Sequence, residues 1–323
     1  MTSSREFSID VRVPASTANL GAGFDCLGLA LELYLSARAT IVWGPGARVV
    51  ARSRGVRGSS ALPSAPEENL IFRAMRHTAD REGFQLPPIR LAVQNDIPMA
   101  SGLGSSAAAT VAGVVLGFAV ARRAVPKEAA LQYAAEVEGH TDNVAASLLG
   151  GLVVTVARPD GSVIGVQKRW PKMIRVVAVT PLFSLETNRS RAVLPKMVER
   201  ADAVHNLQRS ALLVAALEER RYDLIWDALQ DRLHQPYRQR LIPGLEDVLA
   251  TPRMPGLLGL ALSGAGPSVV ALATDRFEKI GSEIARRFEK NGLTATFQTF
   301  EVAQEGFSTS EKHLRQRQMA AQP

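Results

Sequence analysis

Residues 98–121 constrain the fold of this chain more than any other stretch. The segment opens with Pro98-Met-Ala-Ser-Gly-Leu-Gly-Ser-Ser-Ala-Ala108, which holds two glycines, three serines and no charge. An uncharged, mainly apolar run follows from Ala107 to Ala121 and predicts a helix buried on all sides. A glycine loop that opens a helix is typical of an anion site. Glycine lets backbone N–H groups approach a phosphate, and the helix N-terminus adds a favourable dipole.

Composition bounds the class of protein. The chain has 323 residues, of which 46% are apolar and 21% charged, enough for one large domain or two ordinary ones. It has no apolar run long enough to span a membrane, and its first residues lack the apolar core of a signal peptide. Cys26 is the only cysteine, which excludes a disulfide framework and predicts a cytoplasmic location.

The net charge of +7 raises the question of nucleic-acid binding. The basic residues are dispersed, and the densest pairs lie beside acidic residues in helical patterns. Aromatic residues make up only 6% of the chain, which leaves little surface for base stacking. The charge therefore indicates a solvated surface, or attraction to a small anionic substrate, rather than a nucleic-acid partner.

Hydrophobic periodicity predicts a mixed α+β protein. In the first half we expect strands at 7–13, 31–42, 49–50, 89–93 and 152–157, and helices at 67–82, 104–122, 126–138 and 141–149. In the second half we expect strands at 175–180, 257–262, 268–274 and 293–301, and helical segments at 196–230 and 276–291. The pattern divides into domains at 1–170 and 171–302, with a loop at 55–66 and a polar, disordered tail at 303–323.

The glycine loop does not fit two common phosphate motifs. A Walker A loop needs a lysine after its last glycine, and Gly104 is followed by serine. Gly102, Gly104 and Ala107 match the dinucleotide pattern G-x-G-x-x-A, but that pattern also needs an acidic strand end about 20 residues on. Lys127 and Glu128 stand there, at the start of another predicted helix. A plain glycine turn would leave the paired serines at the helix start unexplained.

Three further segments carry polar groups at close spacing. Asn19 and Asp25 are separated by two glycines after the first strand, so a tight loop could aim both at one ligand, although turn chemistry alone would also explain them. Residues 138–143 place two carboxylates, an imidazole and an amide beside apolar helices, although capping could account for some of them. Residues 263–268 form a Ser/Gly turn between two apolar strands, which a bare hairpin would tolerate.

Together and in this order, the four segments resemble the GHMP kinase superfamily, and within it the homoserine kinase family. Val13–Asp25 is similar to that family's V-P-A-S-x-A-N-L-G-x-G-F-D, and Pro98–Ala108 to its nucleotide loop P-x-x-x-G-L-G-S-S-A-A. Glu138–Ala145 matches E-G-H-x-D-N-V-A, and Ser263–Ser268 matches S-G-A-G-P-S. The resemblance covers about residues 10–301, and the ordered combination is far more specific than any single motif.

The resemblance implies a two-domain α+β fold. The N-terminal domain would resemble ribosomal protein S5 domain 2, and the C-terminal domain would be ferredoxin-like. It implies ATP-dependent phosphorylation of the side-chain hydroxyl of L-homoserine, a step of threonine biosynthesis, by a Mg²⁺-dependent homodimer. The nucleotide loop carries over to the following residues: Pro98, Met99, Ala100, Ser101, Gly102, Leu103, Gly104, Ser105, Ser106, Ala107 and Ala108.

The resemblance also assigns metal and substrate residues. The Mg²⁺ ligands carry over to Ser106 and Glu138, with Glu136 as the alternative because the spacing to the histidine varies in the family. The homoserine contacts carry over to the following residues: Asn19, Asp25, His140, Asn143, Arg191 and Arg238. The side chains nearest the chemistry would be His140, Asp142 and Asn143.

Two departures from the family pattern bear on these assignments. Arg191 belongs to a T-x-x-A-R-x-x-L-P pattern in which Ser190 replaces the alanine, and Arg189 lies two residues away as a competing candidate. Arg238 closes a P-Y-R triplet without any departure. Ala146 stands where a proline is common and touches no proposed ligand.

The identity of a general base is open at this level. Related kinases place an aspartate at the Asp142 position, partnered by a lysine from the first motif, but the segment Pro14–Thr17 holds no lysine. We therefore expect catalysis by positioning and charge neutralisation, with direct proton transfer to the γ-phosphate. The alternatives are a GHMP kinase for threonine, mevalonate or a sugar, a nicotinamide-dependent oxidoreductase, and a non-catalytic binding module.

Overall fold

The computed structural model describes residues 7–41, 48–49 and 65–313. The elements of the first half are β1 (Phe7–Ala18), β2 (Leu27–Ile41), β3 (Arg48–Val49), α1 (Leu70–Glu82), β4 (Ile89–Asn95), α2 (Ser105–Val120), α3 (Lys127–Glu138), α4 (Asp142–Leu149), β5 (Leu152–Ala157) and β6 (Val163–Lys168). Those of the second half are β7 (Arg175–Pro181), α5 (Thr187–Ala192), α6 (Arg200–Glu218), η1 (Tyr222–Leu224), α7 (Ile225–Ala228), α8 (Gln235–Arg238), η2 (Gln239–Leu241), α9 (Leu245–Leu249), β8 (Leu257–Leu262), β9 (Val269–Ala273), α10 (Phe277–Lys290), β10 (Ala295–Phe300) and β11 (Ser308–His313).

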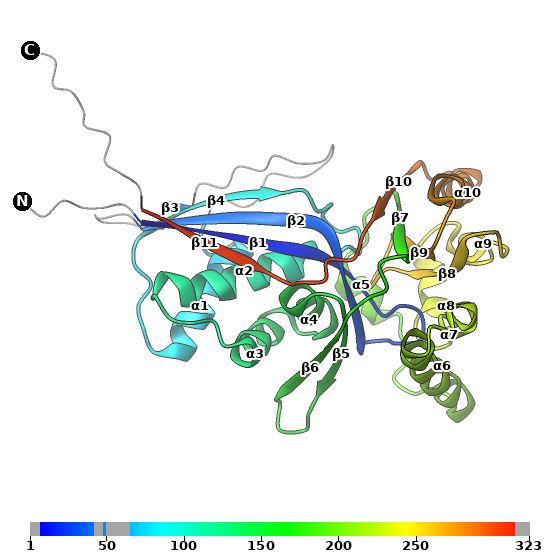
Figure 1. Cartoon of the computed structure of the whole chain (residues 1–323), viewed down its shortest axis with the longest axis horizontal. Coiled ribbons are helices and arrows are strands. Elements are labelled where there is room, and N and C mark those ends of the chain that lie inside the picture. The colour runs from blue at the N-terminus through cyan, green and yellow to red at the C-terminus, as the bar shows by residue number, and fades with distance from the viewer. Residues whose placement is uncertain (1–6, 42–47, 50–64, 314–323) are drawn as a thin grey trace, which may run out of the picture.

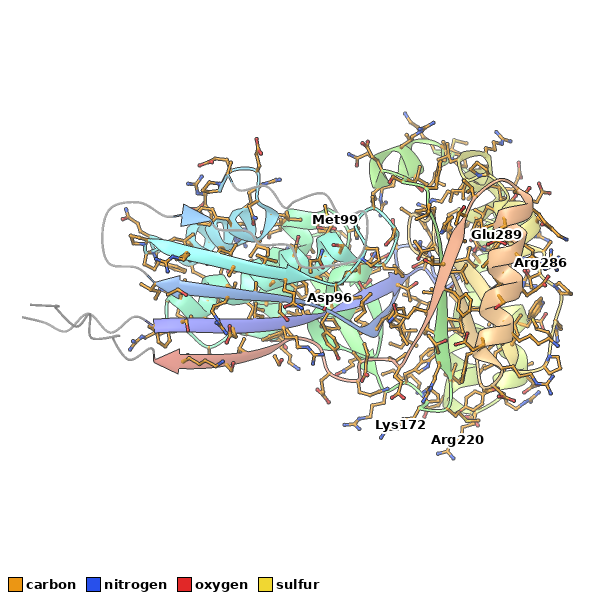
Figure 2. All side chains as sticks on the ribbon, turned by 90° about the horizontal axis from the view of Figure 1, so that it is seen from above. Asp96, Met99, Lys172, Arg220, Arg286 and Glu289 are labelled. Atoms are coloured by element: carbon orange, nitrogen blue, oxygen red, sulfur yellow. The ribbon has the colours of Figure 1, made fainter. Side chains whose placement is uncertain are left out.

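One part of the described structure consists of two layers, a seven-stranded sheet and four helices. The strand order is β11-β1-β2-β4-β3, with β5 paired to β2 and β6 paired to β5. Helices α1–α4 cover one face of this sheet (Figure 1), and seen from above (Figure 2) the strands β11, β1, β2 and β4 lie open on the other face. This face can stay solvated because residues alternate along β4, with every second side chain buried. Helix α2 is apolar almost all round and fills the centre of the core.

A second, four-stranded sheet has the order β10-β7-β9-β8. The amphipathic helix α10 packs its buried residues, among them Ile280, Ile284 and Phe288, onto the core of this half. The chain therefore changes sheet between Lys168 and Arg175. We propose the domain division there, close to residue 171. No helix in the described part of the chain is both long and apolar enough to cross a membrane.

Several expectations need correction. The predicted tail is wrong over 303–313, because β11 adds to β1 as an antiparallel edge strand, and only 314–323 lie outside the described residues. Strand β6 was missed, because its side chains are only half-buried or exposed. The helical stretch 196–230 is broken into α6, η1 and α7. Most of the predicted loop 55–66 lies outside the described residues.

Candidate active site

One pocket at the junction of the two sheets collects residues from all four motifs. Its walls are formed by Asn19, Asp25, Pro98, Ala100, Ser101, Gly102, Leu103, Gly104, Ser105, Ser106, Ala107, Glu138, His140, Asp142, Asn143, Leu185, Thr187, Arg191, Arg238, Gly264, Ala265 and Gly266. The two halves of the protein each contribute part of it, so the pocket exists only when they are packed together.

The glycine loop is held against the Ser263–Ser268 turn. Ser263 donates from Oγ to the carbonyl of Gly102 at 2.7 Å, and the N–H of Ser268 donates to the carbonyl of Ser101 at 3.1 Å. A Cβ at Gly102 would lie 2.3 Å from the carbonyl oxygen of Ser263. Gly104 caps α2 without a side-chain hydrogen bond, so the first-turn N–H groups of the helix are open to a phosphate.

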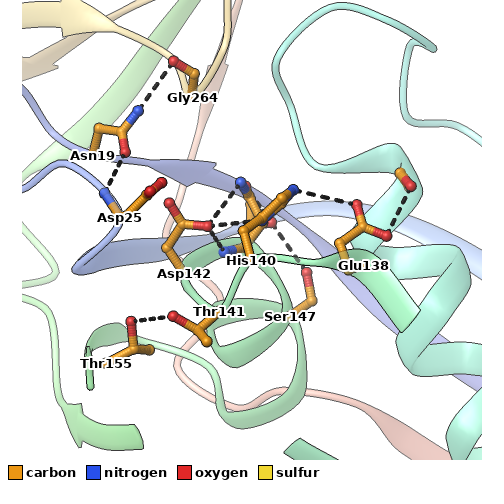
Figure 3. Close-up of polar contacts among 12 residues, drawn as sticks. Asn19, Asp25, Glu138, His140, Thr141, Asp142, Ser147, Thr155 and Gly264 are labelled. Atoms are coloured by element: carbon orange, nitrogen blue, oxygen red, sulfur yellow. Dashed lines mark hydrogen bonds and ion pairs between the residues drawn. The ribbon is translucent and has the colours of Figure 1, made fainter. Parts of the chain in front are cut away.

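Glu138 reaches back to α2 from the end of α3. Its Oε2 accepts from Ser106 Oγ and from Thr110 Oγ1, both at 2.9 Å. Its other carboxylate oxygen faces His140 (Figure 3). Its side chain is 8% exposed, and Thr110 is fully buried. Two hydroxyls and one carboxylate thus converge at the start of the helix that opens the glycine loop. These are the hard oxygen donors that Mg²⁺ prefers.

His140 lies between two carboxylates. Its Nδ1 is 3.0 Å from Asp142 Oδ1, and its Nε2 is 3.6 Å from Glu138 Oε1. Burial opposes charging of the ring, but the hydrogen bond to Asp142 and the two negative charges outweigh it and raise the pKa of His140. Asp142 Oδ1 also accepts from the backbone N–H of Asn143 at 2.7 Å, and Asn143 Oδ1 accepts from Ser16 Oγ at 3.0 Å.

Asp25 and Arg191 face each other across the pocket in a two-point ion pair. Arg191 donates from Nη2 and Nη1 to the two carboxylate oxygens of Asp25 at 2.7 and 3.0 Å. Both side chains are more than one-third exposed. Asn19 fixes the loop that carries Asp25, because its Oδ1 accepts from the Asp25 N–H and its Nδ2 donates to the Gly264 carbonyl.

Arg238 is a buried cation bonded to neutral partners. It is 2% exposed, and it donates from Nη1 to the Gly264 carbonyl at 2.8 Å and from Nε to the Ser190 carbonyl at 3.3 Å. Burial, reinforced by the charge of Arg191, lowers its pKa to about 10, so it stays protonated at neutral pH. Within the described residues, no carboxylate forms a salt bridge with it. A buried guanidinium in this state is suited to bind an incoming anion.

The structure brings together most of the predicted residues and places two alternatives outside the pocket. Glu136 does not line the pocket, because its carboxylate bonds His77 at 2.7 Å on another part of the surface. Arg189 is exposed and also outside the pocket. Two loop residues are absent from the walls, because Met99 projects outward (Figure 2) and Ala108 is buried in α2.

Sequence reasoning missed Thr110, Leu185 and Thr187. Thr110 could have been found from its position one helical turn after Ser106 on the same helix face. Leu185 carried no usable signal, because it belongs to no motif and only packing brings it to the pocket. Thr187 did carry one, because it opens the T-x-x-A-R-x-x-L-P pattern that contains Arg191.

Comparison with known proteins agrees with this arrangement. Family models for the GHMP kinases N terminal domain and the GHMP kinases C terminal match residues 69–151 and 213–290. These two matches, together with a pocket that both halves of the chain line, define a GHMP kinase. The homoserine kinases of Saccharomyces cerevisiae and Deinococcus radiodurans are 38% and 42% identical, covering 94% and 90% of this chain and 98% and 94% of their own lengths. The chain belongs to the homoserine kinase family.

Solved structures of other proteins share the fold of this chain. The crystal structure of homoserine kinase from Cytophaga hutchinsonii aligns with a TM-score of 0.83 at 30% identity, over 94% of this chain and 97% of that one. The mevalonate diphosphate decarboxylase of Staphylococcus aureus, at 14% identity and a TM-score of 0.63, shares the fold.

Proposed function

We propose that this protein transfers the γ-phosphate of ATP to the side-chain hydroxyl of L-homoserine, giving O-phospho-L-homoserine. One observation supports an amino-acid substrate above mevalonate or a sugar. The pocket that contains the glycine loop is also lined by Asp25, by its ion-pair partner Arg191, and by Arg238, which forms no salt bridge with a described carboxylate. A zwitterionic amino acid satisfies both signs of charge. Mevalonate has no ammonium and would leave Asp25 unexplained.

The nucleotide half of the site is the loop 98–108 with the N-terminus of α2. Its open N–H groups would bind phosphate oxygens of ATP. Ser106 and Glu138 would hold Mg²⁺, with Thr110 fixing the carboxylate. The described residues offer no cluster of three His, Cys, Asp or Glu side chains for a metal, so phosphate and water would complete the coordination. The ion would neutralise charge on the phosphates.

In the substrate half, Asp25 would bind the ammonium, and Arg191 and Arg238 the carboxylate. These contacts would direct the hydroxyl of homoserine toward the glycine loop, where His140 and Asn143 can orient it by hydrogen bonds. No lysine lines the described pocket. Asp142 Oδ1 is already engaged by His140 and Asn143. We therefore propose that these residues act by positioning, and that the hydroxyl proton passes to the transferred phosphoryl group.

A coupled assay for ADP release tests this function. The wild-type protein should turn over ATP with L-homoserine and discriminate against L-threonine, mevalonate and sugars. Arg238→Ala should raise the homoserine KM by roughly two orders of magnitude, as expected for a truncated buried charge contact, and leave the ATP KM nearly unchanged. Equal changes in both constants would contradict the carboxylate assignment. ATP turnover only with another acceptor would replace homoserine as the substrate.

The homodimer and the cytoplasmic location implied by the resemblance remain predictions. Sedimentation at micromolar protein, with and without homoserine, would test the first, and cell fractionation would test the second.

A further inference from the structure

His234 is buried in the wall behind the substrate half of the pocket, and the proposed mechanism gives it no role. It has no exposed surface and precedes α8, the short helix that ends at Arg238. Its Nδ1 lies 3.1 Å from Arg238 Nη1, and its Nε2 lies 2.8 Å from the carbonyl of Gly21.

These contacts define the protonation state of the ring. A guanidinium can only donate, so Nδ1 of His234 must accept with its lone pair. A carbonyl can only accept, so Nε2 must carry the proton. The ring is therefore neutral. Burial, the largest influence, lowers the pKa of His234 and agrees with this state.

Neighbouring groups keep the ring and the guanidinium in place. Phe24 stacks on His234 with ring centroids 5.2 Å apart and lies 5.4 Å from the guanidinium carbon of Arg238. The carboxylate of Asp231 is close to the ring but is occupied, since its two oxygens accept from Asn206 Nδ2 and from three backbone N–H groups, including that of His234.

We propose that His234 is a positioning residue that aligns Arg238 for the substrate carboxylate without forming a salt bridge with it. A neutral acceptor holds the guanidinium without neutralising it, whereas a carboxylate at the same place would form a salt bridge and compete with the substrate. This inference rests on the proposed function, because it assumes that the substrate's carboxylate binds Arg238.

Two isosteric variants test the role of charge. In both His234→Asn and His234→Asp, an oxygen can replace Nδ1 as the acceptor for Arg238, and both leave the same cavity. Only the aspartate adds a negative charge. We expect the homoserine KM of His234→Asn to stay within a few-fold of wild type and that of His234→Asp to rise at least about tenfold, with the ATP KM unchanged in both.

A third variant tests alignment without adding charge. In His234→Gln the amide can still reach Gly21, but the acceptor no longer lies at the Nδ1 position. We expect its homoserine KM to exceed that of His234→Asn at comparable melting temperature. This comparison also decides the matter if His234→Asp does not fold. Equal homoserine KM values for Asn and Asp, or for Asn and Gln if Asp does not fold, would overturn the proposal.

A substrate analogue separates this inference from the proposed function. 3-Aminopropan-1-ol keeps the hydroxyl and amine of homoserine but lacks the carboxylate. Wild type should prefer homoserine strongly, and His234→Asp should lose much of that preference because only the carboxylate contact is weakened. If wild type shows no preference, the proposed function fails. If wild type shows it and His234→Asp retains it in full, only the role of His234 fails.

Discussion

Arg191 and Asp25 bind each other through two hydrogen bonds across the pocket that is proposed to receive a zwitterion. Homoserine would replace this internal pair by two external ones, with its ammonium on Asp25 and its carboxylate on Arg191. The binding free energy of homoserine then depends on the difference between the ion pairs that the ligand forms and the Arg191–Asp25 pair that it replaces. A ligand that carries both charges is therefore favoured over a ligand that carries only one.

If homoserine replaces the Arg191–Asp25 ion pair in this way, one substitution at Asp25 should have opposite effects on the binding of two ligands. Asp25→Asn should weaken homoserine binding at least about tenfold, because the ammonium loses a charged partner. The same variant should tighten the binding of 4-hydroxybutyrate, which has a carboxylate but no ammonium, because Arg191 is no longer occupied. Competition assays with both compounds measure this. Weaker binding of both would show that the pair is not exchanged.

Gly102→Ala should disrupt the nucleotide loop. The added Cβ would lie 2.3 Å from the Ser263 carbonyl oxygen, at a φ of +85°. Gly161→Ala is the matched control, because its φ is +82° but nothing lies within 4 Å. The control should lose about 1 kcal/mol of unfolding free energy from backbone strain alone. Gly102→Ala should lose more and show a raised ATP KM, measured by denaturant titration and kinetics. Equal losses would contradict the steric argument.

Thr110→Val should weaken Mg²⁺ binding without affecting homoserine. The change removes one of two hydroxyls that bond Glu138 Oε2, and loss of such a supporting contact typically costs roughly 10–100-fold in metal affinity. Mn²⁺ binding with ADP, followed by electron paramagnetic resonance, measures this directly. Thr110→Ser should restore binding. Thr78→Val removes a buried hydroxyl that bonds only the Ala74 carbonyl, and it should leave metal affinity unchanged.

Asp142→Asn distinguishes positioning from base catalysis. An amide oxygen can still accept from the Asn143 N–H, so positioning predicts a kcat loss below about 100-fold. A general base predicts a loss of about 10²–10⁴-fold and the disappearance of one limb of the pH–kcat profile. Retention of both limbs with a modest loss would support direct transfer of the proton to phosphate.

The burial of His234 in its neutral form predicts that its contribution to stability is lost in mild acid. Its pKa is lowered by burial, so the unfolded chain takes up a proton below about pH 6.5 that the native protein does not bind. The contribution of His234 to the unfolding free energy should therefore fall as the pH drops below that value. Urea titrations between pH 7.5 and 5.5 should show a steeper decrease for wild type than for His234→Asn. Identical slopes would show that His234 does not contribute.

Local patterns in the sequence were sufficient for much of the fold. The apolar run after the glycine loop predicted α2, and the alternation at 89–93 predicted β4, because both periods depend only on neighbouring residues. The four motifs also indicated the pocket, since each keeps its polar groups within a short loop or helix end. Strand β11 could not be found in this way, because its polar sequence forms a strand only by pairing with β1.

The sequence alone determined which residue types were available for phosphate, metal and amino-acid binding, because spacing along the chain is a local property. Tertiary structure decided which of them meet. It placed Glu138, and not Glu136, beside Ser106, and it set the neutral His234 behind Arg238. It also packed the Ser263 turn, more than 150 residues away in sequence, onto Gly102. Such contacts depend on how the two sheets pack together. The periodicity of a short stretch of sequence carries no information about that packing.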